Sequence, residues 1–340
     1  MLAMGRSSRR HTMATCGCAG DVSQRSTGAA ISKCRGICVK ILLTGSTGQL
    51  GNALKSALQA TGEIIIPPRD QMDFCKPELV RATIQQVRPD VIINPAAYTA
   101  VDLAETEPEL ARLVNAITPG VIADEARKIG AALIHYSTDY VFDGSKRNAD
   151  GELLSYTETD TPNPINVYGK TKLEGEQIIR ASGCNHLIFR TSWIYSMFGK
   201  NFLLTMLRFA KERDELKIVN DQWGAPSSAG WLAQTTQSIL AQLLQTKSQT
   251  QWWSQHNGLY HLTPNGRTSW CGFTEEIFRL AAAERLLEKA APRVLGIPSS
   301  AYPTPATRPV NSCLNSELIG ERFSMTIPTW QSELAICMAS

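Results

Sequence analysis

Short apolar runs alternate along the chain with longer segments whose apolar residues recur at helical spacing. The runs have strand length, show little polar alternation, and occupy residues 39–44, 63–66, 91–94, 132–136 and 187–190. Helical patterns separate them: Leu50, Leu54 and Leu58 share one helix face, and further helices are expected over residues 77–87 and 110–128. Strands without polar alternation are typical of parallel sheets that are covered on both faces. The pattern therefore predicts an α/β fold, a Rossmann-like doubly wound parallel sheet, with a smaller second domain.

The strict alternation of strands and helices loosens after residue 195. Helices are expected over residues 201–213, 231–244 and 269–288, a turn-rich loop over 220–226, and a polar loop over 249–257. We therefore predict a domain boundary near residue 195, with some later segments returning to the sheet.

The first 38 residues are rich in Ser, Gly, Arg and Cys and show no apolar periodicity. They lack the apolar core of a secretory signal. An acid-poor leader rich in Arg and Ser resembles a transit peptide, and a start codon upstream of the working protein is the alternative. We expect this leader to be disordered and without function.

Composition narrows the class of protein. The 340 residues are 43% hydrophobic and 19% charged, which is a normal globular mixture. The net charge of +3 arises largely in the leader, so the remainder is near neutral, which argues against nucleic-acid binding. No apolar run is long enough to span a membrane. The nine cysteines lack paired metal-ligand spacing, so we interpret them as reduced thiols of a cytoplasmic protein, with disulfide or metal use as the alternative.

A glycine-rich turn follows the first apolar run and precedes the first helical pattern. The spacing Gly45-x-x-Gly48-x-x-Gly51 sits in the strand–turn–helix context that a dinucleotide fingerprint requires. Gly45 permits the tight turn, Gly48 lets a pyrophosphate approach the backbone, and Gly51 allows close helix packing. The unpaired N–H groups of the helix N-terminus are suited to phosphates. A glycine-rich turn without a ligand is the alternative.

The end of the second apolar run bears on the choice of cofactor. An acid at this position binds a ribose 2′-hydroxyl, whereas an arginine suits a 2′-phosphate. Arg69 therefore favours NADPH, and the adjacent Asp70 leaves NADH open.

Tyr168 and Lys172 are the strongest candidates for chemistry. They follow two prolines at the start of a helical run, and residues four apart lie on one helix face. A tyrosine with a pKa near 10 is a poor acid at neutral pH. A cation about 4 Å away favours the phenolate by roughly 1 to 4 kcal/mol, or about one to three pKa units. We therefore expect Lys172 to lower the pKa of Tyr168. An exposed Tyr and Lys on an ordinary helix are the alternative.

A hydroxyl at the end of the fourth apolar run supports this interpretation. Ligands of doubly wound sheets bind beyond the carboxyl ends of the strands, where Thr138 is expected to lie. Its hydroxyl can hydrogen-bond the same oxygen that Tyr168 protonates. A Thr that only caps the strand exit is the alternative.

Several longer motifs occur in a fixed order along the chain. They are Gly45-Ser-Thr-Gly-Gln-Leu-Gly51, Asn94-Pro-Ala-Ala-Tyr-Thr-Ala-Val-Asp102, Ser137-Thr-Asp-Tyr-Val-Phe-Asp-Gly144, Asn166-Val-Tyr-Gly-Lys-Thr-Lys172, Arg190-Thr-Ser-Trp193, Asn220-Asp-Gln-Trp-Gly-Ala-Pro226 and Tyr302-Pro-Thr-Pro-Ala-Thr-Arg-Pro309. Together they resemble the dTDP-4-dehydrorhamnose reductase family of the extended short-chain dehydrogenase/reductase superfamily. The resemblance covers residue 39 to the C-terminus, and the leader has no counterpart.

The resemblance implies an NAD(P)-binding Rossmann domain over residues 39–195 and a mainly substrate-binding domain over 196–340. It implies that Tyr168 donates the proton, that Lys172 also holds the nicotinamide ribose, and that Thr138 polarises the substrate carbonyl. The further cofactor contacts it implies are Gln49, Leu50, Gly51, Asp73, Phe74, Ala97, Tyr98 and Thr99. The substrate contacts it implies are Thr138, Asp139, Tyr140, Trp193 and Val101, with Asn201 and Arg308 expected at the nucleotide diphosphate because an anion needs donors.

The reaction implied by the resemblance is NADPH-dependent reduction of the C4 keto group of dTDP-4-dehydro-L-rhamnose. Another nucleotide-sugar epimerase or dehydratase on the same scaffold is one alternative, and a non-enzymatic regulatory subunit is another. Some family members use glutamates for a Mg²⁺-bridged dimer, but the matching position here is Ala53, so we expect no metal. A homodimer is left open.

Overall fold

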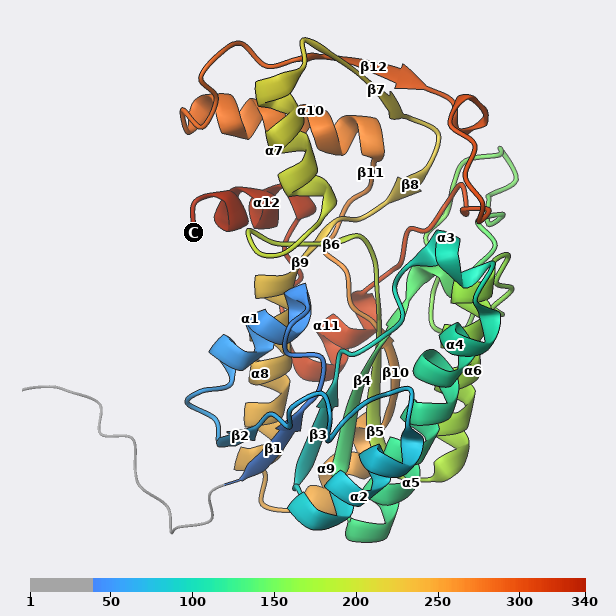
Figure 1. Ribbon diagram of the computed structural model, residues 1–340, viewed down its shortest axis with the longest axis vertical. Coiled ribbons are helices and arrows are strands. Elements are labelled where there is room, and N and C mark those ends of the chain that lie inside the picture. Colours follow the sequence, from blue (N-terminus) through green and yellow to red (C-terminus); the bar gives the residue numbers. More distant parts are fainter. Residues whose placement is uncertain (1–38) are drawn as a thin grey trace, which may run out of the picture. The chain divides into compact units, whose positions relative to one another are not determined.

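A six-stranded parallel sheet forms the centre of the part of the protein that the structure describes (Figure 1). The computed structural model describes residues 39–340, so the predictions for residues 1–38 lie outside it. The strand order is β10-β5-β4-β3-β1-β2. The strands are β1 (Lys40–Leu43), β2 (Glu63–Ile65), β3 (Val91–Asn94), β4 (Ala132–Thr138), β5 (Asn185–Thr191) and β10 (Gly258–His261). The predicted doubly wound parallel sheet is confirmed.

Helices cover both faces of this sheet (Figure 1). One face carries α1 (Gln49–Ala57), α8 (Ala229–Gln245), α9 (Gln249–His256) and α11 (Glu317–Phe323). The other carries α2 (Pro77–Val87), α4 (Pro108–Arg112), α5 (Thr118–Ile129) and α6 (Val167–Ser182). Two apolar clusters fill the layers between helices and sheet, which is why the strands are apolar on both sides.

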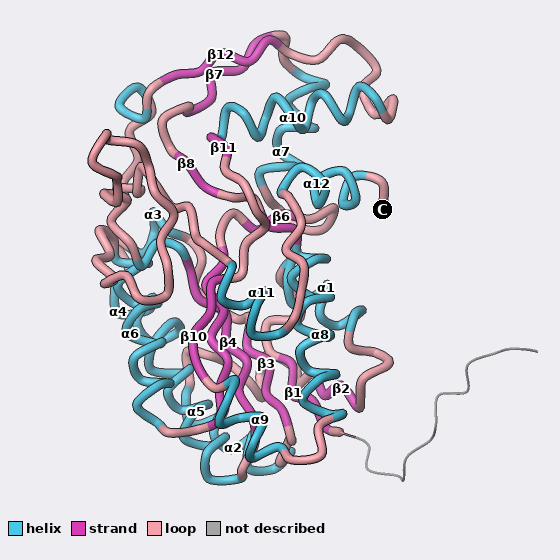
Figure 2. Tube along the Cα trace, turned by 180° about the vertical axis from the view of Figure 1, so that it is seen from behind, coloured by secondary structure: helices cyan, strands magenta, loops and turns pink. Residues whose placement is uncertain are grey.

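A second lobe is built from residues after 195 and has its own apolar cluster. Its main elements are α7 (Phe202–Glu212), β7 (Glu215–Val219), α10 (Trp270–Ala283), β12 (Arg293–Ile297) and α12 (Trp330–Met338). Figure 2 shows these elements gathered at one end of the sheet. Because α8, α9, β10 and α11 pack with the sheet instead, the predicted division at residue 195 stays a prediction.

The structure also contains several short elements. They are α3 (Val101–Ala104), the 3-10 turn Asp139–Val141, β6 (Ile194–Tyr195), β8 (Trp223–Gly224), β9 (Ser227–Ser228), β11 (Thr268–Ser269) and the 3-10 turn Ser299–Ala301. None of the helices within residues 39–340 combines the length and the apolar character needed to cross a bilayer.

The predicted helix over residues 110–128 is present, but its middle part is π-helical instead of α-helical. A π-helical segment, Leu113–Ile117, separates α4 from α5. Pro119 explains the interruption, because a proline has no N–H to donate to the carbonyl of Asn115 four residues earlier. That carbonyl lies instead against Gly175 of α6, where an added Cβ would be only 2.2 Å from the oxygen.

The predicted polar loop over residues 249–257 is also wrong, since these residues form α9. The Ser248 hydroxyl accepts a hydrogen bond from the Gln251 N–H and begins the helix. Trp252 and Trp253 are buried in the cluster shared with α8 and α11. Burial of two large rings stabilises this short helix, and its glutamines are themselves good helix formers.

Candidate active site

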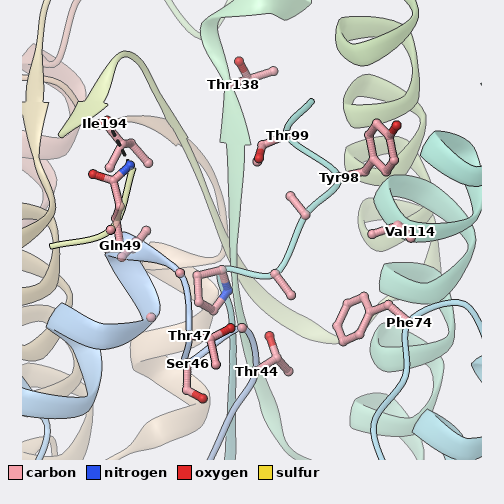
Figure 3. A pocket seen from close by; sticks show the side chains of 18 of the residues that line it. Thr44, Ser46, Thr47, Gln49, Phe74, Tyr98, Thr99, Val114, Thr138 and Ile194 are labelled. Carbon is pink, nitrogen blue, oxygen red and sulfur yellow. Dashed lines mark hydrogen bonds between the residues drawn. The ribbon is translucent and has the colours of Figure 1, made fainter. Parts of the chain in front are cut away.

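A cavity of about 1170 Å³ opens beyond the carboxyl ends of the central strands and extends to the second lobe. Strand order reverses at β1, which pairs with β2 on one side and β3 on the other. The connections leaving β1 and β3 therefore diverge, and such a switch point is where doubly wound folds bind ligands. Figure 3 shows Thr44, Ser46 and Thr47 at one part of the cavity and Thr138 at another.

The glycine-rich turn of residues 45–51, which joins β1 to α1 and is called the glycine elbow below, lines this cavity. Gly45 has a left-handed backbone with φ of 54°, and a Cβ there would lie 2.9 Å from the backbone of Ala96. A Cβ at Gly51 would lie 2.0 Å from the carbonyl oxygen of Gly45. Gly48 begins α1 without a side-chain cap, so the first N–H groups of the helix are left for a ligand. The elbow therefore presents unpaired donors at a positive helix end, which suits a pyrophosphate.

Gln49 ties the elbow to the second lobe. Its Nε2 donates to the Ile194 carbonyl at 3.3 Å, drawn as a dashed line in Figure 3, and its Oε1 accepts from the Ser196 hydroxyl at 3.0 Å. Both partners lie more than 140 residues away in the sequence. The elbow and the loop after β6 therefore enclose the same part of the cavity.

The residues predicted for the adenosine end of the cofactor also line the cavity. Arg69, Asp73 and Phe74 belong to its wall, whereas Asp70 does not. The Cys75 backbone N–H donates to the Asp73 carboxylate at 3.0 Å, and this hydrogen bond lowers the pKa of Asp73. Arg69 is therefore placed where it could meet a 2′-phosphate in the cavity, whereas the Asp70 carboxylate does not line the cavity.

The predicted cofactor contacts Ala97, Tyr98 and Thr99 lie on the connection after β3 and line the cavity. Figure 3 labels Tyr98 and Thr99 on this connection. Asn115 in the π-helical segment fixes this connection: its Oδ1 accepts from the Tyr98 N–H at 2.8 Å, and its Nδ2 donates to the Tyr98 carbonyl at 3.1 Å. The Tyr98 hydroxyl donates to Glu107 at 2.5 Å, and this hydrogen bond raises the pKa of Tyr98 to about 12.

Helix α6 places Tyr168 at the cavity and Lys172 one turn deeper. Asn166 caps the helix by accepting from the Gly169 N–H at 2.8 Å. The same side chain donates to the Thr307 carbonyl at 2.9 Å, which anchors the helix start to the C-terminal segment. Tyr168 lines the cavity, while Lys172 is buried beneath it and 1% exposed.

Lys172 does not lower the pKa of Tyr168 as the sequence led us to expect. Burial raises the pKa of Tyr168 to about 12, and the Thr138 hydroxyl only partly offsets this effect. The Lys172 ammonium donates to the Tyr136 carbonyl at 2.6 Å and lies 3.2 Å from the Nε2 of His135. Burial lowers the pKa of Lys172 to about 8, while Glu176 acts in the opposite direction. The ammonium is thus directed toward β4, which the sequence did not indicate.

The 3-10 turn after β4 brings three predicted substrate contacts to the cavity: Thr138, Asp139 and Tyr140. The Thr138 hydroxyl donates to Asp139 Oδ1 at 2.9 Å and accepts from the Tyr140 N–H at 3.1 Å. Asp139 Oδ2 is buried without a hydrogen-bond partner, and burial raises the pKa of this carboxyl to about 7. Tyr140 packs edge-on against Tyr168, with ring centroids 5.8 Å apart.

Trp193 and Val101 complete the predicted residues found in the cavity wall. Trp193 has a left-handed backbone with φ of 46° and stacks on Trp270 with ring centroids 3.6 Å apart and planes 7° apart. Gly224 leaves room for the indole, because a Cβ there would lie 2.7 Å from it. A strained backbone at a ligand cavity is typical of a functional position.

Two predicted substrate residues, Asn201 and Arg308, are not among the residues that line the cavity, and their contact with the diphosphate stays a prediction. Asn201 caps α7 by accepting from the Leu204 N–H at 3.0 Å, and its amide N–H groups are directed to the Ser196 and Phe198 carbonyls. Arg308 forms a two-point ion pair with Asp102, at 2.9 and 2.8 Å. Both amide N–H groups of Asn201 and several of the five donors of Arg308 are therefore engaged within the protein.

Other residues of the wall were not predicted. Ser46 and Thr47 lie inside the glycine elbow, and their position between Gly45 and Gly48 was a usable signal. Lys200 and Trp270 come from the second lobe, where no sequence pattern indicated a site. Within residues 39–340 no group of His, Cys, Asp and Glu side chains is arranged to hold a metal ion.

Comparisons with known proteins agree with this site. The family described as RmlD substrate binding domain matches residues 39–340. The dTDP-4-dehydrorhamnose reductase of Burkholderia thailandensis is 43% identical over 88% of this chain and 98% of its own length. That of Escherichia coli K12 is 44% identical over 86% of this chain and 95% of its own length.

Solved structures show the same similarity. The dTDP-4-dehydrorhamnose reductase of Bacillus anthracis in complex with NADP has a TM-score of 0.79 and 31% identity, covering 89% of this chain and 99% of that one. The UDP-glucose 4-epimerase of Thermus thermophilus has a TM-score of 0.69 at 16% identity, covering 88% of this chain and 98% of that one, and shares the fold alone. The chain therefore belongs to the RmlD substrate binding domain family, the family of the dTDP-4-dehydrorhamnose reductases.

Proposed function

We propose that this protein reduces the C4 keto group of dTDP-4-dehydro-L-rhamnose to give dTDP-L-rhamnose, with NADPH as the reductant. The observation that carries the proposal is one continuous cavity that joins the glycine elbow to Thr138 and Tyr168. Its volume exceeds the roughly 300–1,000 Å³ of a site for a single drug-sized ligand, which supports a cofactor and a nucleotide sugar bound side by side.

The elbow fits the proposed cofactor. Gly48 and the uncapped start of α1 would hold the pyrophosphate, and Arg69 would meet the 2′-phosphate. Ala97, Tyr98 and Thr99 would lie along the cofactor, and Lys172 would hold its nicotinamide ribose. NADPH supplies the hydride when it is bound. Because Asp70 is outside the cavity wall while Arg69 is part of it, we infer that NADPH is preferred to NADH.

The protein's own residues would supply the proton and stabilise the developing charge. Tyr168 would donate its phenolic proton to the C4 oxygen as the carbonyl is reduced. The Thr138 hydroxyl would hydrogen-bond the same oxygen, exchanging its present bond to Asp139 for one to the substrate. A donor placed where charge develops contributes most in a cavity shielded from water. Burial raises the pKa of Tyr168, so the phenol keeps its proton at neutral pH but is a weaker acid than a free tyrosine; the hydrogen bond from Thr138 acts in the opposite direction.

Replacing Tyr168 with Phe tests the proposal. We expect kcat to fall by about 10²- to 10⁴-fold, the usual contribution of a positioned acid, with NADPH affinity largely kept. The assay is NADPH consumption with the dTDP-keto sugar, with dTDP-glucose as the control substrate. Tyr195→Phe is the matched control variant: its buried hydroxyl has no hydrogen-bond partner and Tyr195 is not in the cavity wall. Turnover near that of the wild type in Tyr168→Phe would remove the residue from the chemistry.

The purified wild-type protein also distinguishes the rival functions. An epimerase or dehydratase would retain about one NAD⁺ per chain through purification and would not consume NADPH. A regulatory subunit would show no turnover with any keto sugar.

We further propose that the enzyme works in the cytoplasm with its thiols reduced. The cysteines of residues 39–340, namely Cys75, Cys184, Cys271, Cys313 and Cys337, are all free. The resemblance also allows a homodimer, which light scattering of the full-length chain would test.

A further inference from the structure

Lys172 shares a buried hydrogen-bonded network with residues that the reaction scheme does not use. His135 on β4 is fully buried, and its Nε2 lies 3.2 Å from the Lys172 Nζ. Its Nδ1 lies 3.1 Å from the amide nitrogen of Asn94 on β3. The other end of the Asn94 amide accepts from the Thr44 hydroxyl at 2.6 Å, next to the glycine elbow. Three parallel strands thus contribute one side chain each to a chain of contacts that ends on Lys172.

Counting hydrogens restricts how this network can be arranged. An ammonium has three N–H donors and no acceptor, so it can meet His135 only if Nε2 carries no proton. A neutral imidazole then has its proton on Nδ1, which needs an acceptor on Asn94. Asn94 provides one when its amide oxygen faces the ring, because the Thr44 hydroxyl can donate or accept. The amide orientation given above, with the Asn94 nitrogen toward the ring, instead places the ring proton on Nε2 and requires an uncharged Lys172. A charged Lys172 therefore requires the Asn94 amide to be turned by 180°, which exchanges two atoms that are assigned from their hydrogen bonds.

Other charged groups around Lys172 do not compete for this ammonium. Glu176, one turn further along α6, forms a buried ion pair with Arg190 of β5 at 2.7 Å. Its carboxylate also accepts from the Ser137 hydroxyl. Burial and the nearby Lys172 charge hold the pKa of His135 well below its ordinary value, so the ring stays neutral.

We propose that His135 is the positioning residue of Lys172: its neutral ring, held in the Nδ1–H form by the oxygen of an Asn94 amide turned by 180°, accepts one N–H of the ammonium. The Tyr136 carbonyl accepts a second at 2.6 Å. Within residues 39–340 the third N–H of Lys172 has no hydrogen-bond partner. Two fixed bonds therefore leave one N–H of the ammonium free, and in the proposed function this N–H would serve the cofactor ribose. This inference rests on the proposed reductase function.

Two substitutions of similar size separate the two contacts of the ring. His135→Gln can place its amide oxygen near the position of Nε2 and keep an acceptor for Lys172. His135→Asn reaches only the position of Nδ1, so it keeps the contact with Asn94 and leaves the ammonium with one acceptor fewer. If His135 had only a structural role, His135→Gln and His135→Asn should affect the activity to a similar degree.

The first readout is the pH profile of kcat for NADPH consumption with the dTDP-keto sugar. Losing an acceptor disfavours the ammonium, so in His135→Asn the fall of kcat at high pH should move to lower pH by about one unit. In His135→Gln the high-pH limb should stay within a few tenths of a unit of the wild type. Equal profiles for the wild type and both variants, or a shift in His135→Gln alone, would overturn the proposal.

The second readout does not depend on turnover. In protein labelled with ¹⁵N-histidine, the signal of His135 is the one absent from both variants, and its nitrogen shifts report the ring proton. We expect a neutral ring protonated on Nδ1 from about pH 6 to pH 8. A charged ring, or a proton on Nε2, would overturn the proposal even in an active enzyme. A wild-type protein that does not reduce the keto sugar would instead refute the proposed function, and the labelled histidine would still test the network.

Discussion

Glu176 and Arg190 form an ion pair that is almost completely buried, with side-chain exposures of 1% and 3%. The carboxylate meets the guanidinium at two points, 2.9 and 2.7 Å, and also accepts from the Ser137 hydroxyl. Replacing Glu176 with Gln leaves the guanidinium buried without a counter-charge. Removing one partner of a buried pair typically costs about 3 to 5 kcal/mol. Because Gln keeps the volume and one acceptor oxygen, we expect a loss near the lower end of that range, about 3 kcal/mol.

The assay is equilibrium unfolding in urea at pH 7 with the full-length chain. Glu276→Gln is the control, since its pair with Arg279 lies at the surface and is screened by water, and no resolvable change is expected. Replacing both buried charges, as Glu176→Leu with Arg190→Met, should recover most of the loss because no charge is then left unpaired. A loss below about 1 kcal/mol in Glu176→Gln would refute the reasoning. So would a double variant less stable than Glu176→Gln alone.

Two further predictions concern the cavity. Gly51→Ala would place a Cβ 2.0 Å from the Gly45 carbonyl oxygen, so the elbow must shift and NADPH affinity should fall by roughly tenfold or more in a fluorescence titration. Gly230→Ala, whose Cβ would meet nothing within 4 Å, should bind NADPH as the wild type does. Asp139 has a pKa of about 7 when folded and an ordinary value of 3.8 when unfolded, so the folded protein binds more protons between those values. The contribution of Asp139 to stability should therefore decrease as the pH rises from 4 to 7, and Asp139→Asn should remove that part of the urea-unfolding pH dependence. An unchanged pH dependence in Asp139→Asn would contradict the assigned burial.

The sequence indicated most of the cavity wall on the sheet side. Strand ends could be located from apolar runs, and parallel strands bring their carboxyl ends to one edge, so Gly45, Thr138 and Tyr168 could be placed together before any coordinates. The π-helical segment and α9 were not predicted, for different reasons. Pro119 cannot donate an N–H to the Asn115 carbonyl, so the α-helical hydrogen bonds are interrupted there. The π-helical form of that interruption depends on α6, which packs against the same carbonyl. Trp252 and Trp253 made α9 a helix through contacts with elements distant in the sequence.

The side chains expected at the substrate diphosphate have partners that the sequence did not indicate, for a related reason. An anion needs donors, and Asn201 and Arg308 have them, but a donor is available only if the protein leaves it unused. Asn201 caps α7 and Arg308 pairs with Asp102, some 206 positions away in the sequence. The sequence around Asn201 and Arg308 did not indicate these partners within the protein.

By itself the sequence determined the order of strands and helices, the glycine elbow and the spacing of Tyr168 and Lys172, because these depend on backbone hydrogen bonds and side-chain periodicity within a few residues. Only the tertiary structure decided which groups surround them. It placed His135 against Lys172, Trp270 against Trp193 and Lys200 in the cavity wall. These contacts join segments that are far apart in the sequence, and nothing in the sequence says which distant segments come together. The burial and the charge around the site are therefore set only when the sheet and the second lobe pack together.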